Sequence, residues 1–498
     1  MSNKAMLLSF LGGFLSLSIE VIWIRLFSFF TGSLPQAFSF TLAVFLIGIA
    51  IGSFIGKRIC REGRASIDNI GHIFALSGLL DLVAIGLLLS FVQSRLLIFV
   101  LSIFFCALVR GIVFPIVHHL GSEAHKTGAA ISNVYFANVM GCTLSPIFIG
   151  FYLFDVLTTQ QTYLAVIAAT FIIAAFCLRH QLVKLSVIIG AAVSVLCLMI
   201  PDKLITALSQ KPDLVLDSII ENKHGFIQVY KDEQDNKLVF GSNVYDGMLN
   251  VDLALNSNMI DRAYLLPVIA PEAKNVLVVG LSTGSWVDVL ATMPGLEKIT
   301  VIELNPAYTQ FASRYSEMAR ILQDKRVHII TDDGRRWIKR NADQKFDFIL
   351  MNTTFHWRSY STNLLSKEFL TMAKSRLAEN GFLYFNTTSS FDAYYTAKQV
   401  FPYVYQYKNM ALASLRPIES PTDQNIAAAF QGLRWSEGNP VFASAEALRQ
   451  GMARMREYSI LPYEKIDFSP LSRQPEIITD QNMITEYKYG RFNELGTK

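Results

Sequence analysis

Seven apolar stretches in the first 200 residues constrain the fold of this chain more than any other feature. A helix needs about 20 apolar residues to cross a bilayer. Stretches of this length lie at 6–30, 36–56, 70–93, 96–118, 131–154, 160–178 and 184–200. The last is the shortest and carries Lys184 at its edge, so six spans plus one interfacial segment is the alternative. The sequence therefore predicts a multi-span α-helical membrane domain over residues 1–200.

Basic residues lie in alternate loops between these stretches, and the positive-inside rule assigns such loops to the cytoplasm. They are Lys57, Arg58, Arg61, Arg64, Lys126, Arg179 and Lys184. Seven spans would then leave the rest of the chain outside, whereas a fold that uses a cytosolic nucleotide should lie inside. The side of the membrane that holds the C-terminal part stays open at this stage.

Charged residues within the apolar stretches are costly in hydrocarbon unless they pair, face protein or lie near an interface. Glu20 and Arg25 fit either a snorkelling pair at a helix end or a polar site inside the helical bundle. Arg110, with Pro115 nearby, fits a kinked helix that lines a cavity. These residues keep transport among the hypotheses.

Three glycines spaced four residues apart, Gly48, Gly52 and Gly56, share one face of the second stretch. Small residues at this spacing let two membrane helices approach closely. We therefore expect this face to pack against another helix.

Net charge, cysteine positions and hydrophobic content limit which partners and ligands are expected. The net charge is only +4, and no run of Lys and Arg with interleaved aromatic residues occurs, so nucleic acid is not an expected partner. All five cysteines precede residue 200, mostly inside apolar stretches, so neither a disulfide framework nor a bound metal is expected. Hydrophobic residues make up 52% of the chain and charged residues 17%, which predicts a membrane part and a soluble part.

The pattern changes after the membrane part. A linker and a small antiparallel β region are expected at 201–265, because apolar and polar residues alternate there around a polar turn. An α/β Rossmann-like domain is expected at 266–498. Its strands are predicted at 275–280, 298–304, 326–332, 346–352 and 381–388, with helices between them. This alternation is typical of a parallel sheet covered on both faces.

Ligands of such sheets lie beyond the carboxyl ends of the strands. The first strand runs into GLSTGS, where Gly280, Ser282 and Gly284 allow the backbone to approach a nucleoside. The second strand ends at Glu303, whose carboxylate can accept hydrogen bonds from ribose hydroxyls. The third ends beside Asp333, where an adenine contact is expected.

At these motifs the chain resembles the spermidine synthase family, within the class of S-adenosylmethionine-dependent methyltransferase-like folds. It is similar to bacterial membrane proteins in which a multi-span segment is fused to such a domain. The matching stretches are EVIWIRLFSFFTGS, FLIGIAIGSFIGKRI, NVYFANVMG, VLVVGLSTGS, VIELNP, TDDGRRWI, NLLSKEFL and ITDQNMITEY. The resemblance implies that Gly280 and Gly284 shape a nucleoside pocket, that Glu303 holds the ribose and that Asp333 lies beside the adenine.

The resemblance also implies the ligands and the location. The implied substrate is S-adenosylmethionine or its decarboxylated form, with a small-molecule acceptor such as a polyamine and no metal. The implied location is the cell inner membrane, as a multi-pass protein. A homodimer is left open.

The loop after the fourth strand departs from the family. Spermidine synthases carry an acidic D-[ST]-[ST]-D-P loop there, whose carboxylates hold or deprotonate the attacking amine, whereas this chain reads NTTFHW from Asn352. His356 is either a base or a packed member of an aromatic cluster. Asp246 is either a substitute carboxylate or a turn residue before a glycine. Arg335 and Arg336 are either anion-binding groups or surface residues at a helix start.

Three functions follow from these observations. The leading hypothesis is a membrane-anchored transferase that uses an adenosyl sulfonium compound and a non-standard acceptor, with His356, Asp246 and Asn352 as candidate catalytic residues. The second is a membrane scaffold that keeps the fold without the chemistry. The third is a transporter whose soluble part senses a nucleoside or a polyamine.

Overall fold

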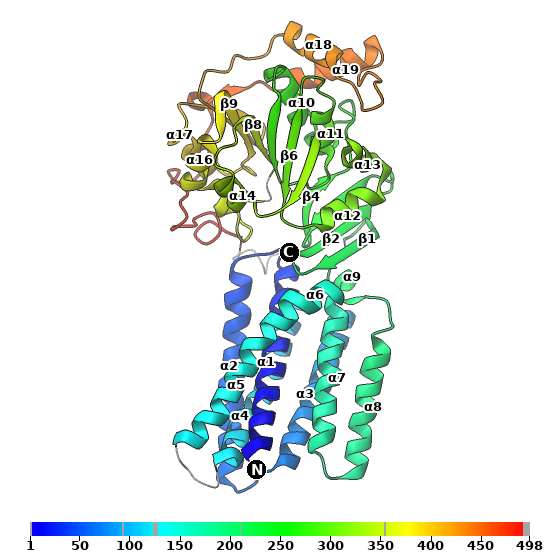
Figure 1. Ribbon diagram of the computed structural model, residues 1–498, viewed down its shortest axis with the longest axis vertical. Coiled ribbons are helices and arrows are strands. Elements are labelled where there is room, and N and C mark those ends of the chain that lie inside the picture. Colours follow the sequence, from blue (N-terminus) through cyan, green and yellow to red (C-terminus); the bar gives the residue numbers. More distant parts are fainter. Residues whose placement is uncertain (1, 92–93, 123–127, 210, 353–354, 492–498) are drawn as a thin grey trace. The chain divides into compact units, whose positions relative to one another are not determined.

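The computed structural model describes residues 2–91, 94–122, 128–209, 211–352 and 355–491. The chain divides into two compact units, which Figure 1 shows in ribbon form. The helical unit comprises Met1–Pro212 and Glu221–Lys223, and the α/β unit comprises Asp213–Ile220 and His224–Lys498. Most of the predicted β region at 201–265 therefore belongs to the α/β unit.

Helices build the helical unit, and most of them are long and apolar. They are α1 (Ser2–Phe30), α2 (Gln36–Arg61), α3 (Ile67–Ser90), α4 (Arg95–Ser122), α5 (Gly128–Phe148), the π-helix η1 (Ile149–Leu153), α6 (Phe154–Val156), α7 (Thr159–Cys177), α8 (Gln181–Cys197) and α9 (Leu204–Leu208). Among the described residues, six helical stretches are long and apolar enough to span a membrane. The seventh predicted span coincides with α8, whose 17 residues are near the lower limit for a span. That α8 crosses the membrane stays a prediction. Lys126, one of the basic loop residues, lies outside the described residues.

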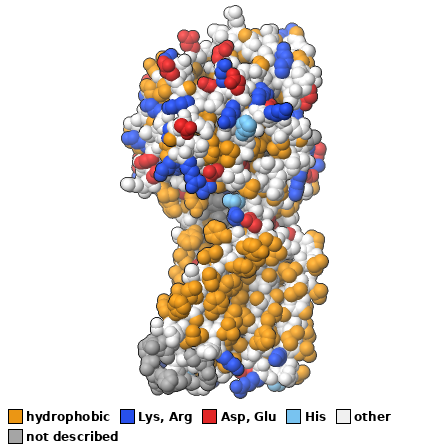
Figure 2. All heavy atoms as spheres, viewed as in Figure 1, with side chains coloured by type: hydrophobic (Ala, Val, Ile, Leu, Met, Phe, Trp, Pro, Cys, Tyr) orange, Lys and Arg blue, Asp and Glu red, His pale blue; other side chains and the backbone are white. Residues whose placement is uncertain are grey.

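Apolar side chains cover the visible surface of the helical unit, while Lys and Arg gather near its lower end in Figure 2. Phe54, Phe151 and Phe176 are 72%, 70% and 82% exposed. A soluble protein rarely exposes a continuous apolar surface of this kind. The surface is therefore compatible with a bilayer anchor.

The glycine face of α2 packs against α4, as the sequence predicts. A Cβ atom added at Gly52 would lie 1.9 Å from the carbonyl oxygen of Leu108, and one added at Gly48 would lie 2.6 Å from that of Phe104. Gly111 of α4 makes the reciprocal contact, because its Cβ would lie 2.5 Å from the carbonyl oxygen of Ile49. Only glycine lets the two backbones lie this close.

A buried ion pair joins α3 to α4. Arg110 Nη1 donates to Asp81 Oδ1 at 3.1 Å, and Arg110 Nη2 donates to Asp81 Oδ2. The two side chains are 3% and 0% exposed. Arg110 Nη1 also donates to the carbonyl oxygen of Cys106 at 3.1 Å. These contacts explain how a charged Arg110 can be buried, since its guanidinium links α3 to α4.

Arg25 of α1 contacts the helices that follow η1. Its Nε donates to Thr159 Oγ1 at 2.9 Å, and its guanidinium lies 4.3 Å from the ring centroid of Phe154. Glu20, one turn earlier, is only 6% exposed. Arg25 therefore packs on α6 and α7, and it does not simply extend to the helix end.

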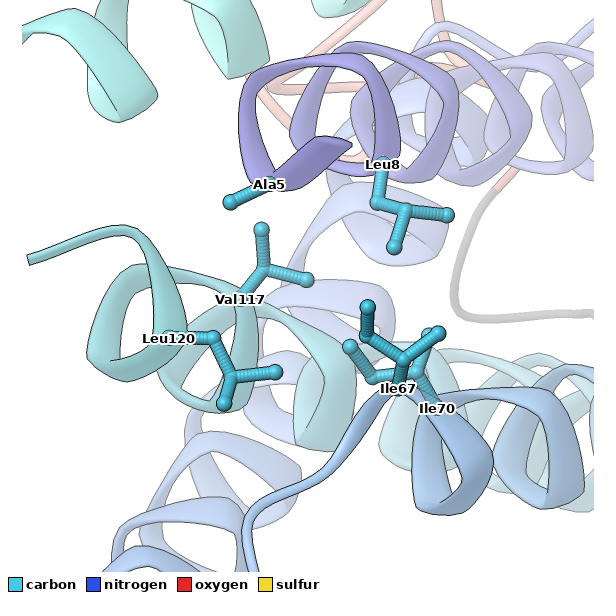
Figure 3. A pocket seen from close by; sticks show the side chains of 6 residues that line it. All are labelled: Ala5, Leu8, Ile67, Ile70, Val117 and Leu120. Carbon is cyan, nitrogen blue, oxygen red and sulfur yellow. The ribbon is translucent and has the colours of Figure 1, made fainter. Parts of the chain in front are cut away.

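Figure 3 shows a small apolar cavity between α1, α3 and α4, toward which the labelled side chains converge. Its volume is about 10 Å³, and it is lined by Ala5, Leu8, Ile67, Ile70, Val117 and Leu120. That volume is about one water molecule, and the lining offers no polar partner. This cavity is a packing defect and not a substrate site.

Two sheets form the α/β unit. The smaller has the order β1 (Val215–Asn222), β2 (Gly225–Lys231), β3 (Lys237–Gly241) and β4 (Val244–Met248). The larger has the order β12-β10-β11-β9-β8-β5-β6-β7. Its strands are β5 (Asn275–Val279), β6 (Lys298–Glu303), β7 (Val327–Thr331), β8 (Phe346–Met351), β9 (Leu377–Asn386), β10 (Tyr403–Tyr407), β11 (Met410–Ser414) and β12 (Leu461–Pro462). The run from β9 to β7 is parallel, as predicted.

Helices cover both faces of the larger sheet. They are α10 (Asp261–Ile269), α11 (Ser285–Ala291), α12 (Ala307–Arg314), α13 (Ser316–Gln323), α14 (Gly334–Arg340), α15 (Thr362–Leu365), α16 (Lys367–Lys374), α17 (Phe391–Lys398), α18 (Asp423–Gly432) and α19 (Ala445–Arg456). Alternate residues of β5 enter opposite cores, with Val276 and Val278 in one and Leu277 and Val279 in the other. Burial on both faces explains why the strand NVLVV is almost wholly apolar.

The α2–α4 contact predicts that Gly52→Leu destabilises the protein by about 1–3 kcal/mol or more, because the added side chain must push the helices apart. Gly86→Leu is the matched control, since a Cβ there meets nothing within 4 Å. Thermal unfolding in detergent should show a lower melting temperature for Gly52→Leu than for Gly86→Leu. Equal melting temperatures would contradict the contact.

The Asp81–Arg110 pair predicts non-additive mutations. Arg110→Met leaves a buried carboxylate without its partner and should cost about 3–5 kcal/mol. The double variant Asp81→Leu/Arg110→Met should regain most of that loss, because both charges are removed. Thermal unfolding of the single and double variants measures the coupling, and an additive loss would rule out a pair that acts as a unit.

Candidate functional site

The loop that follows β5 has a backbone suited to close approach of a ligand. Gly280, Ser282 and Gly284 have φ values of +90°, +49° and +73°. Gly280 N donates to the carbonyl oxygen of Ile302 at 2.9 Å, and Gly284 N donates to that of Leu281 at 2.8 Å. The loop therefore turns sharply at the carboxyl end of β5, where ligands of parallel sheets lie.

Glu303, the last residue of β6, fixes this loop. Its Oε2 accepts from Leu281 N at 2.7 Å, and its Oε1 accepts from Asn305 N at 2.8 Å. Each carboxylate oxygen has a second lone pair for another donor. Burial raises the pKa of Glu303 to about 7, against the backbone N–H groups, which lower it. The carboxylate thus ties the loops after β5 and β6 together, and its contact with ribose stays a prediction.

Asp333 caps the helix after β7. Its side chain accepts from Arg336 N at 2.7 Å, as the N-cap of α14. The neighbouring arginines are used within the fold, since Arg336 pairs with Asp332 and Arg335 pairs with Asp480. The structure therefore gives both arginines intramolecular partners.

Asp246 lies within strand β4 and not in a turn. Its Oδ2 accepts from the hydroxyl of Tyr308 at 2.5 Å. Its backbone carbonyl accepts from the hydroxyl of Ser282 at 2.9 Å. These bonds bring the small sheet against the loop after β5 and against α12, so Asp246 lies beside the predicted nucleoside loop.

Arg358 adds a positive charge near Asp246. Burial lowers the pKa of the Arg358 guanidinium, while the nearby Asp246 and Tyr308 raise it. Burial also raises the pKa of Tyr308 well above its ordinary value, with Asp246 adding to that effect. Tyr308 and Arg358 were not predicted as site residues from the sequence. The one available signal was that Arg358, a cationic residue, directly follows the altered loop.

The loop after β8 is held against the end of β9. Asn352 Oδ1 accepts from Asn386 Nδ2 at 3.1 Å, and Asn352 O lies 3.7 Å from where a Cβ on Gly280 would stand. Thr353 and Thr354 of the altered loop lie outside the described residues. Asn352 therefore borders the same strand-end region as the glycine turn.

His356 is anchored to the loop after β9. Its backbone N donates to Thr388 Oγ1 at 2.8 Å, and its Nδ1 lies 3.0 Å from the same oxygen. Burial lowers the pKa of His356, so the imidazole is neutral at neutral pH. The rings of its neighbours Phe355 and Trp357 stack on each other, with centroids 5.5 Å apart. His356 itself is held against Thr388 and is uncharged.

A chain of hydrogen-bonded polar groups connects Tyr245, next to Asp246, with the ends of the strands β8 and β9. Tyr245 donates to Asn258 Oδ1 at 3.1 Å, and Arg262 Nη2 donates to the carbonyl oxygen of Asn258 at 2.8 Å. Arg262 Nη1 donates to Asn409 Oδ1 at 2.9 Å. Arg262 is 3% exposed, and burial lowers its pKa.

The same chain ends at the strand-end asparagines. Asn409 Nδ2 donates to Asn386 Oδ1 at 2.9 Å, and Asn386 in turn donates to Asn352. Residues at or after β4, β8, β9 and β10 are thus joined by hydrogen bonds. Such hydrogen-bonded networks help to hold the walls of a site rigid.

A family model described as the spermine/spermidine synthase domain matches residues 263–416. This range contains Gly280, Glu303, Asp333, Asn352 and His356. The polyamine aminopropyltransferase of Vibrio vulnificus is 30% identical over 185 residues, which are 36% of this chain and 55% of that protein. The chain therefore spans about half the length of that relative.

Two further similarities differ in extent. The polyamine aminopropyltransferase of Corynebacterium efficiens is 21% identical over 382 residues, 73% of this chain and 72% of that protein. This match is longer than the α/β unit, so it includes part of the helical unit. A spermidine synthase structure from Thermotoga maritima covers 41% of this chain and 74% of its own, at 17% identity and a TM-score of 0.35. The chain thus carries a spermine/spermidine synthase domain at residues 263–416, within its α/β unit.

Proposed function

We propose that the protein is a membrane-anchored transferase whose α/β unit binds S-adenosylmethionine or its decarboxylated form. The observation that carries this proposal is the Glu303 carboxylate, which holds the loops after β5 and β6 at 2.7 and 2.8 Å within the matched family domain. The named relatives are aminopropyltransferases. By similarity, the decarboxylated compound and transfer of its aminopropyl group are the leading assignment.

The proposed group transfer needs few catalytic groups from the protein. An acceptor lone pair attacks the carbon bound to the sulfonium, the carbon–sulfur bond breaks, and its electrons neutralise the sulfur. One proton leaves the acceptor. Because the sulfonium is already a good leaving group, the protein must mainly orient two substrates and accept that proton.

We assign the proton acceptor to Asp246 or to His356. Asp246 lies beside the nucleoside loop through Ser282, and His356 is neutral at neutral pH because burial lowers its pKa. Asn352 contributes an amide at the end of β8, where it orients and does not accept protons. These roles do not need the acidic loop that this chain lacks.

The acceptor is proposed to be less cationic than a diamine. Of the described residues in the loop after β8, none from Phe355 to Arg358 carries a carboxylate. Asp246, the carboxylate proposed as a proton acceptor, has Arg358 as an electrostatic neighbour. A dication would therefore meet one partly compensated anion, whereas a monoamine or a neutral nucleophile would meet no such penalty.

The first prediction concerns nucleoside binding. Methylthioadenosine should raise the melting temperature, because it binds only the folded protein. The shift should grow as pH rises through about 7, since Glu303, whose pKa is raised to about 7, then becomes the carboxylate that accepts ribose hydrogen bonds. Glu303→Gln should reduce affinity by about tenfold or more and remove the pH dependence.

The matched control for that experiment is Glu379→Gln, a side chain 83% exposed on a surface ion pair. It should retain both the shift and its pH dependence. No shift in the unaltered protein between pH 6 and pH 8 would overturn the nucleoside site.

The second prediction concerns the acceptor. Asp246→Asn should lower kcat for an amine acceptor by about 10²-fold or more, if it accepts the proton. Arg358→Gln should improve kcat/KM for a diamine relative to a monoamine, because it removes the opposing charge. Arg336→Gln, an arginine 55% exposed, is the control. Unchanged kcat in Asp246→Asn together with a loss in His356→Gln would assign the base to His356 alone.

A further inference from the structure

A second cavity lies in the helical unit, at the turn between α2 and α3. Its volume is about 330 Å³, at the lower end of the range for small-molecule sites. It is lined by Ile55, Arg58, Ile59, Arg64, Asn69, His72 and Ile73. The three isoleucines form an apolar wall, and the polar residues form a largely cationic rim.

Glu62 holds the two arginines of this rim together. Arg58 Nε donates to Glu62 Oε1 at 2.9 Å, and Arg64 Nη2 donates to Glu62 Oε2. A guanidinium has five N–H donors, so both arginines keep donors for a further anion. One carboxylate against two guanidiniums leaves a net positive charge. On α3, His72 Nε2 lies 3.5 Å from Asp68 Oδ2.

The apolar wall continues into the lipid-facing surface. Ile55 is 37% exposed, and Ile51 and Phe54, nearer the middle of α2, are 43% and 72% exposed. On α3, Leu76 and Leu79 are 46% and 53% exposed. Both helices pack on α4. An acyl chain that leaves the cavity along α2 or α3 therefore meets continuous apolar surface.

We propose that this cavity binds the phosphate group of an anionic phospholipid, with its acyl chains lying along the isoleucine wall. The cationic rim lies where the apolar surface of α2 and α3 ends, at the depth of a headgroup. Basic residues at the ends of membrane helices attract anionic headgroups by about 1 kcal/mol each. A free phosphate would use the rim but not the wall.

The test uses the full-length protein in a neutral detergent. The melting temperature is measured against increasing phosphatidylglycerol, with phosphatidylcholine and inorganic phosphate in parallel. Phosphatidylglycerol should raise it more than either of the others. In Arg58→Gln/Arg64→Gln, the half-saturating concentration of phosphatidylglycerol should rise roughly tenfold or more.

The matched control is Lys57→Gln/Arg61→Gln, which removes two charges from the same turn but none from the cavity lining. It should keep most of the phosphatidylglycerol effect. Ile59→Trp, which fills the cavity without changing charge, should lose the effect, so the proposal does not depend on the arginine variant alone. Equal losses in the two double variants would show diffuse attraction and overturn a defined site. No effect of phosphatidylglycerol, or an equal effect of inorganic phosphate, would also overturn it.

Discussion

The carboxylate of Glu303 is the interaction on which the candidate site depends. It accepts from the backbone N–H groups of Leu281 and Asn305, so a single side chain sets the spacing of two strand-end loops. Ser282 then links the first of these loops to β4, which brings Asp246 and Tyr308 beside it. A buried acid that accepts backbone hydrogen bonds costs far less than an unpaired one, which explains how the fold tolerates Glu303.

Much of the α/β unit could be predicted from sequence because its strands are short, apolar and regularly separated by helices. The strands β5 to β9 and their parallel arrangement were predicted, whereas their order in the sheet was not. β10, β11 and β12 were not, because antiparallel additions at a sheet edge have no comparable period. The glycine contact of α2 could also be predicted, since the four-residue spacing of its glycines alone defines one helical face.

The side chains of the candidate site could be predicted only in part from the sequence. Sequence reasoning placed Asp246 near the site but left a turn as the alternative, since an Asp–Gly pair is common in turns. Tyr308 and Arg358 were missed, because their relation to Asp246 is a tertiary one between residues far apart in the chain. Arg110 was read as a cavity lining, whereas its partner Asp81 lies on another helix and has no local signal. Contacts between residues on different helices or strands leave no local pattern in a single sequence.

We infer that this chain still transfers a group from an adenosyl sulfonium compound. The most direct measurement is mass spectrometry of the nucleoside product after the purified full-length protein is incubated with decarboxylated S-adenosylmethionine or S-adenosylmethionine and a mixture of monoamines and diamines. Methylthioadenosine should form from the decarboxylated compound, in amounts that depend on an added acceptor and fall in Glu303→Gln. No acceptor-dependent thioether from either compound would contradict it and favour a scaffold that keeps the fold alone.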